Sequence, residues 1–191
     1  MSAINPKRYQ DAQDKENRES VNVAAIVRVI AFNPEKMTVD VQPISKHLEG
    51  GVYQSQPTIL GVPVSYTKSG GFVFRPWIQP DDIGLVVYVD HDIDKVVANG
   101  KESEPNTERN HSTSDAVFIG GIVTGNSSLS ALPNDSAVIA TEDGSTVLEI
   151  SKGVIRMTTA TVEINAKSNV LVKANGAITM TAPEINLIET P

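Results

Sequence analysis

The chain has 191 residues, of which 40% are hydrophobic and none is cysteine, and its formal net charge is −7. Without cysteine it has no disulfide, no thiolate metal site and no cysteine nucleophile, and its acidity without a basic cluster argues against a nucleic-acid partner. No apolar run approaches the roughly 20 residues of a membrane-spanning helix, and the polar start lacks the apolar centre of a signal peptide, so we expect synthesis in a cytoplasm.

Residues 1–20 are strongly polar and contain the pair Asn5 and Pro6. Asparagine is a good helix cap, and proline is tolerated at the first helical position. The segment therefore predicts a short exposed helix or an arm.

Residues 21–125 have a composition typical of β-strands, in which short runs rich in Val, Ile and Phe are bounded by Gly, Pro, Asn or Asp. Val39 and Val41 alternate with polar neighbours, as a half-buried strand requires. About five strands without intervening helices fit a small barrel of the oligonucleotide/oligosaccharide-binding (OB) type or an SH3-like barrel. The candidate strands are residues 21–32, 37–44, 58–67, 71–78, 83–90 and 116–123.

Two polar stretches separate the β segments. Residues 91–115 are too polar for core and too long for a plain hairpin, so we predict a long surface loop within the barrel domain. Residues 126–144 are rich in small, turn-forming residues and predict a linker. The final segment, residues 145–191, has a different pattern.

That segment is a repeat of apolar pairs, with one residue inside each pair and a new pair every seven or eight residues. The i, i+2 spacing places both members on one face of a strand. The intervening residue is polar in five of six units, Leu171 being the exception. Residues suited to tight corners lie between units: Gly153, Asn165, Asn175, Gly176 and Pro183. The predicted inward residues are Leu148, Ile150, Ile155, Met157, Val162, Ile164, Val170, Val172, Ile178, Met180, Ile185 and Leu187.

A column of such short strands leaves its apolar face open to water unless other strands cover it. The spacing is wrong for a coiled-coil heptad, and single-chain solenoids use about 20 residues or more per coil. Three chains that each supply one wall of a triangular prism can close the core by symmetry. We therefore predict an all-β protein with an N-terminal OB-type barrel followed by an intertwined trimeric β-helix, or β-prism.

Asp90, Asp92 and Asp94 have the spacing of the first ligands of a calcium loop. The rest of that loop fails, because Lys95 and Lys101 occupy the positions that need Gly and Glu. We interpret the aspartates as part of a solvated loop and predict no metal site there.

Two other features suggest chemistry only weakly. His111 lies near Ser112, Ser114 and Asp115, but sequence neighbours are rarely a catalytic triad in space, so we expect a structural role. Trp77 is interpreted as a core or inter-subunit anchor in preference to a sugar platform. No acid/base pair is marked by the sequence, and we predict no catalytic residue and no enzyme activity.

The order of these parts resembles a known family. A barrel entered by VAAIVRVIAFNPEKMTVDVQPI, continuing through PWIQPDDIGLVVYVDHDID and RNHSTSDAVFIGGI to a linker and a β-repeat, is similar to the central membrane-piercing spike proteins of contractile-tailed bacteriophages. The resemblance runs from about Val21 to the C-terminus. It implies a homotrimer made in the host cytoplasm and carried in the virion at the tail baseplate. The barrel would bind the tail hub, and the β-helix would pierce the host outer membrane on sheath contraction.

The chain departs from that family at its end. Many such spikes finish in a His-x-His motif that holds iron, whereas His47, His91 and His111 all precede the repeat. We therefore expect no cofactor. Either the apex closes on Leu187 and Ile188, or a separate tip protein caps it.

The alternative interpretation is a receptor-binding or glycan-degrading tail component that uses the repeat as a stalk. Such a component needs exposed aromatic residues or paired carboxylates. Aromatic residues make up only 5% of the chain, and none lies in the repeat. The sequence therefore favours the spike.

Overall fold

The computed structural model describes residues 7, 21–125 and 127–185. The chain forms two compact units, residues 1–128 and 129–191. Apart from Lys7, the predicted arm at residues 1–20 lies outside the described residues, and so do Leu187 and Ile188.

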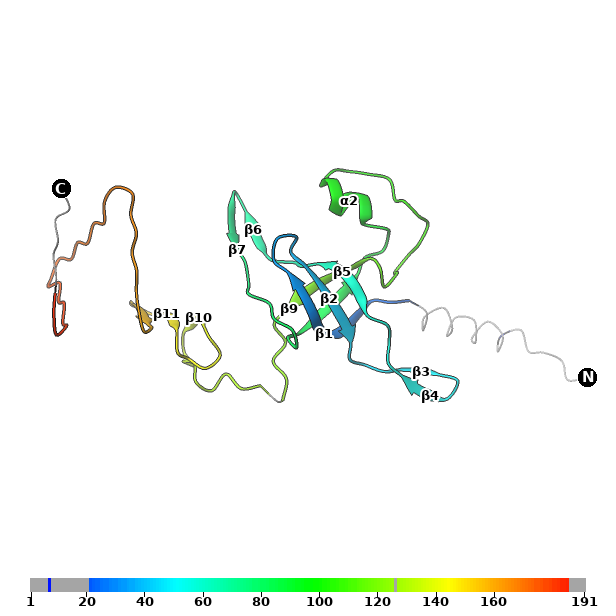
Figure 1. Cartoon of the computed structure of the whole chain (residues 1–191), viewed down its shortest axis with the longest axis horizontal. Helices are drawn as coiled ribbons and strands as arrows, with labels where there is room; N and C mark the ends of the chain where they lie inside the picture. The colour runs from blue at the N-terminus through cyan, green and yellow to red at the C-terminus, as the bar shows by residue number, and fades with distance from the viewer. Residues whose placement is uncertain (1–6, 8–20, 126, 186–191) are drawn as a thin grey trace, which may run out of the picture. The chain divides into compact units, whose positions relative to one another are not determined.

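Unit 1 is built on one five-stranded sheet in the order β5-β2-β1-β8-β9, with antiparallel neighbours throughout. The sheet curls (Figure 1), and its two edges approach each other where Val64 forms a parallel bridge with Phe118. This is a curled half-barrel, so the prediction of a small all-β barrel is confirmed at that level. The strands are β1 (Ala24–Asn33), β2 (Thr38–Pro43), β5 (Ile59–Pro63), β8 (Ile83–Tyr88) and β9 (Ala116–Gly120).

The alternation seen in the sequence decides which face of this sheet is buried. In β2, Val39 and Val41 are buried while the residues between them are only partly covered, and β8 follows the same rule. Side chains alternate across a strand, so one face of every strand lines the interior. The core consists of Val27, Val29, Val39, Val41, Ile59, Val62, Val64, Ile78, Val86, Tyr88, Ala116 and Phe118.

A close contact between neighbouring strands fixes the packing of this core. A Cβ at Gly84 in β8 would lie 2.4 Å from the Phe118 ring and 2.8 Å from the Ile119 carbonyl oxygen. Glycine is therefore required there, because it lets the ring of Phe118 lie directly over the β8 backbone.

Two hairpins leave the sheet, β3 (His47–Glu49) with β4 (Val52–Gln54), and β6 (Thr67–Ser69) with β7 (Phe72–Phe74). Each has a two-residue Gly-Gly turn in which both glycines have positive φ, as a tight hairpin turn of the primed type needs. In Figure 1 both hairpins project away from the curled sheet. Only the strand beginning at residue 71 was predicted from the sequence.

The long loop predicted at residues 91–115 carries one short helix, α2 (Asp94–Asn99). Its two ends are joined where Val89 N–H donates to the Asp115 carbonyl at 2.8 Å. Within residues 7, 21–125 and 127–185, the structure contains no helix long and apolar enough to cross a bilayer.

Unit 2 begins with a three-stranded antiparallel sheet in the order β10-β11-β12. Its strands are β10 (Ala137–Ala140), β11 (Val147–Ser151) and β12 (Val154–Thr158). The first of them falls in the stretch predicted as a linker, where a four-residue apolar run between turn-forming residues gave little strand signal. From residue 159 to 185 the chain forms neither helix nor strand.

The trimeric β-helix is not shown by the structure of one chain. The sequence predicted that each strand steps to a new wall at every corner, but β11 and β12 fold back on each other as a hairpin around Gly153. A single chain has no second or third wall available, so antiparallel pairing within the chain is the remaining way to satisfy these backbone groups.

Candidate functional site

The sheet of unit 2 has one wholly apolar face. Leu148 lies opposite Met157, and Ile150 lies opposite Ile155. Directly opposed residues share a face, and the pairing of Ile139 with Leu148 extends that face across β10. Most of this face is uncovered in the described part of the chain, since Ile155 is 73% and Met157 61% exposed and only Leu148 is half-buried.

The opposite face of the same sheet carries an ion pair. Arg156 Nη1 lies 2.8 Å from Glu149 Oε2, and the two residues are cross-strand partners. These are the residues expected to point outward between the apolar pairs. In β11 and β12 the alternation of the repeat therefore gives one apolar face and one mixed face that carries the ion pair.

Residues 159–185 continue the pattern, and no strand of the described chain pairs with them. Bends recur at residues 159–160, 167–168, 175–176 and 183, so the spacing is close to eight residues, as in the sequence. No described residue after Ser151 is buried or partly buried. The structure thus brings the first four predicted core residues onto one face. It leaves seven others exposed and outside any strand: Val162, Ile164, Val170, Val172, Ile178, Met180 and Ile185.

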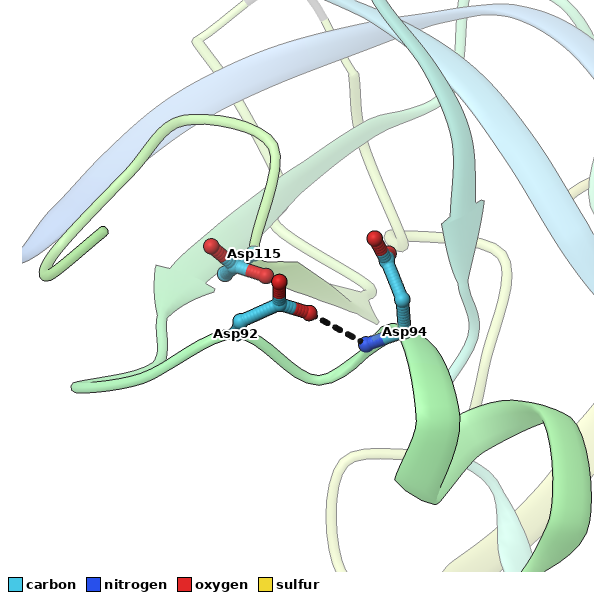
Figure 2. A group of neighbouring side chains, drawn as sticks. All are labelled: Asp92, Asp94 and Asp115. Atoms are coloured by element: carbon cyan, nitrogen blue, oxygen red, sulfur yellow. Dashed lines mark hydrogen bonds between the residues drawn. The ribbon is translucent and has the colours of Figure 1, made fainter. Parts of the chain in front are cut away.

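A second candidate lies in unit 1, where the loop after β8 returns to β9. Asp92, Asp94 and Asp115 gather there (Figure 2), with one carboxylate oxygen from each within 4.8 Å of the others. Asp92 and Asp115 are buried. Asp92 also accepts a hydrogen bond from the Asp94 backbone N–H at 3.0 Å, which shapes the entry into α2.

The guanidinium of Arg109 binds all three carboxylates. Its Nε lies 2.6 Å from Asp115 Oδ2, and its Nη2 lies 2.9 Å from Asp115 Oδ1, so this pair is bidentate. The same Nη2 lies 3.0 Å from Asp94 Oδ2 and 3.2 Å from Asp92 Oδ1. The positive charge that a cation would bring to this cluster is thus supplied by the chain itself.

These contacts shift the acidity of the cluster. The hydrogen bond from Arg109 holds the pKa of Asp115 below its usual range, and the hydrogen bond from the Asp94 backbone does the same for the pKa of Asp92. The carboxylates in turn raise the pKa of Arg109. Asp92, Asp115 and Arg109 therefore stay charged at neutral pH. The cluster is suited to holding the loop against the sheet.

The interpretation of these aspartates as a solvated loop was wrong for Asp92, which is only 5% exposed. Asp90 takes no part in the cluster and lies 3.7 Å from His111 Nδ1. Sequence reasoning missed Arg109 and Asp115 as partners. The one available signal was that Arg109 is the only arginine within the predicted loop.

The structure separates the residues that suggested a nucleophile. Asp115 is bound to Arg109 and to the Ile93 N–H, while Ser112 Oγ accepts from the Ser114 N–H at 3.2 Å. No Ser-His-Asp arrangement forms among these described residues. Trp77 is 72% exposed, so it is not a core residue of this chain.

The comparisons with known proteins identify the family. A family model described as the phage protein Gp138 N-terminal domain matches residues 26–121, just over half of the chain. The chain belongs to this family. A search of the curated proteins found no match. The matched region contains the curled sheet except the first two residues of β1, and it contains the Arg109 cluster. It supports a phage protein of the tail or baseplate type, associated with the virion.

Proposed function

We propose that the protein is a non-enzymatic spike of a phage contractile tail, in which three chains associate through the repeat and pierce the host outer membrane when the sheath contracts. The family match supports the phage setting. The oligomer and the mechanical role rest on unit 2.

The observation that carries the proposal is the uncovered apolar face of unit 2. Its inward residues alternate with Glu149 and Arg156 on the other face, so the apolar side chains are gathered on one side of the sheet. Contiguous exposed apolar surface in a water-soluble protein marks an interaction site. Backbone groups without partners likewise need other strands. A second and a third copy would cover the apolar face and supply strands for the unpaired backbone groups, since each brings an identical apolar face and identical strands.

Force transmission follows from the same arrangement. Strands from three chains, joined along a common axis with a dry core, form a narrow element that resists bending. The working residues are then structural: the apolar pairs of the repeat. Unit 1 would bind the tail hub, and the apex would close on its own residues or take a separate tip protein.

Virions that carry repeat variants test the proposal. Ile178→Asp places a charge on the predicted inward face, and Thr179→Asp places the same charge on the outward face. We expect Ile178→Asp virions to adsorb normally but to fail in permeabilising the outer membrane, measured by uptake of a dye that intact outer membranes exclude. Thr179→Asp virions serve as the matched control and should retain uptake.

The receptor-binding or glycan-degrading alternative gives a different result. A stalk that carries a receptor site would lose adsorption together with uptake in the Ile178→Asp virions. Equal uptake by both variants would contradict a piercing role for the repeat.

A further inference from the structure

We propose that the β6–β7 hairpin of one chain docks on the loop around α2 of a second copy, so that the barrels form a closed head-to-tail ring. This inference rests on the proposed trimer. It assigns an interface to unit 1, whereas the proposed function places self-association in unit 2.

The first partner in this contact is the aromatic hairpin, residues 67–77. Phe72 is 83% exposed, and Phe74 and Trp77 are also exposed. Phe72 and Phe74 share a face because they lie two residues apart in β7, where they are paired with Ser69 and Thr67 across the hairpin. A two-stranded hairpin is marginally stable alone, and aromatic residues and arginine are enriched at protein interfaces. The hairpin therefore has the composition of a buried contact but is uncovered in one chain.

The charge of this region differs from that of the chain. Residues 50–80 contain no Asp or Glu, although the chain has 23 of them, and they carry Lys68 and Arg75. Neither of these two side chains makes an ion pair or hydrogen bond with the described residues. The partner of the aromatic hairpin should therefore be both acidic and partly apolar.

The second partner is the acidic loop, residues 90–108, which contains six acidic and two basic residues. Three of its acids are beside His111 or Arg109, whereas Glu102 and Glu104 are exposed and make no side-chain ion pair with the described residues. The helix α2 adds two exposed apolar side chains, Val96 and Val97. The acidic loop thus offers the negative charge and the apolar surface that a partner of the aromatic hairpin needs.

The symmetry of a ring makes a second copy the favoured occupant. In a cyclic trimer, each interface joins two different patches, so every chain needs one patch of each kind. The aromatic hairpin and the acidic loop leave the half-barrel at different places (Figure 1), and each would be used once. A two-fold dimer could use both patches only if they lay together in one interface, because each patch must there contact its counterpart on the partner reciprocally. An anionic membrane would be repelled by the net charge of −7 and would leave the acidic loop without a partner.

Cross-linking tests this contact in the full chain, which has no native cysteine. Phe72→Cys and Val97→Cys are introduced together, and each is also made alone as a control. We expect linked trimers on non-reducing gels from the double variant only, because equivalent positions lie apart in a three-fold ring. Adding Glu102→Lys and Glu104→Lys should lower the linking yield about tenfold, since like charges oppose docking. Adding Lys68→Glu and Arg75→Glu as well should restore it.

Four results would overturn the inference. If light scattering gives a trimer but the double variant forms no link between chains, the barrel contact is wrong and the proposed function stands. Linking by either single variant would indicate a two-fold contact. Binding of the chain to phosphatidylglycerol vesicles that is lost in Lys68→Glu would make lipid the occupant. A monomeric native chain would contradict the proposed function and this inference together.

Discussion

The two units use the same sequence pattern with opposite results. In unit 1, alternating valines meet other strands of the same chain, and Val27, Val29, Val41 and Val86 are fully buried. In unit 2, alternating apolar pairs meet no cover, and no described residue is buried. The difference lies in the number and order of the strands. The five-stranded sheet curls over its own inner face, whereas the three-stranded sheet β10-β11-β12 has no further strand in the described chain to cover its apolar face. Alternation predicts which face must be covered, and topology decides whether the same chain can cover it.

The largest effect that we expect concerns unit 2. Val170→Asp should dissociate the trimer, because three unpaired carboxylates would meet on a dry axis and each costs several kcal/mol. The matched control is the neighbouring Leu171→Asp, which adds the same charge on the opposite side of the strand. Analytical ultracentrifugation should give single chains for Val170→Asp and trimers for Leu171→Asp. Identical behaviour of the two variants would contradict the assignment of Val170 to the inward face and of Leu171 to the outward face.

In unit 1 we expect a large effect on folding without an effect on association. Phe118 is almost fully buried at the closure of the half-barrel, so Phe118→Ala should lower the free energy of unfolding by about 3–5 kcal/mol. Urea denaturation followed by circular dichroism measures this change. The control Ile155→Ala removes an exposed side chain of unit 2 and should leave the unfolding of unit 1 unchanged. A similar loss for both variants would show that the two units do not fold independently.

Arg109→Met should lower the melting temperature of unit 1, because it leaves the buried carboxylates of Asp92 and Asp115 without their counter-charge. Arg28→Met is the control, since Arg28 forms only a long, exposed pair with Asp81 at 3.9 Å. Differential scanning calorimetry should separate the two variants clearly. Equal melting temperatures would mean that the cluster does not hold the loop.

The smallest effect that we expect is a dependence of stability on pH. Because the pKa values of Asp92 and Asp115 are lowered in the folded chain, their stabilisation is fully present above the ordinary Asp pKa of about 3.9. It is lost as the pH falls through their folded pKa values. Urea titrations from pH 6 downward should therefore show stability falling below about pH 5. The decline should be shallower in Arg109→Met, and an equal slope in both proteins would contradict this origin.

Local patterns in the sequence predicted much of the curled sheet. The turn at Asn33 was readable because Asn-Pro favours a turn, and the Asn33 side chain indeed accepts from the Glu35 and Lys36 backbone N–H groups. Val39 and Val41 alternate clearly enough to fix their face. The β3–β4 hairpin was missed because each of its strands has only three residues. Short strands carry too little alternation to be distinguished from loop.

The Arg109 cluster could not be predicted in the same way. Its members come from the end of the loop after β8, from the first turn of α2 and from the residue before β9, and only the folded loop brings them together. Spacing indicated Asp90, Asp92 and Asp94 as a group, but Asp90 points to His111 instead. The inward residues of the repeat are different, because their spacing alone sets the face, and their burial depends on other chains.

The mass of the native full-length chain tests the central claim most directly. Size-exclusion chromatography with light scattering should give three times the chain mass of 20.5 kDa, and the value should persist on dilution to low micromolar concentration. A single species at 20.5 kDa would contradict the proposal that three copies of the repeat cover one another's apolar faces, and with it the proposed spike.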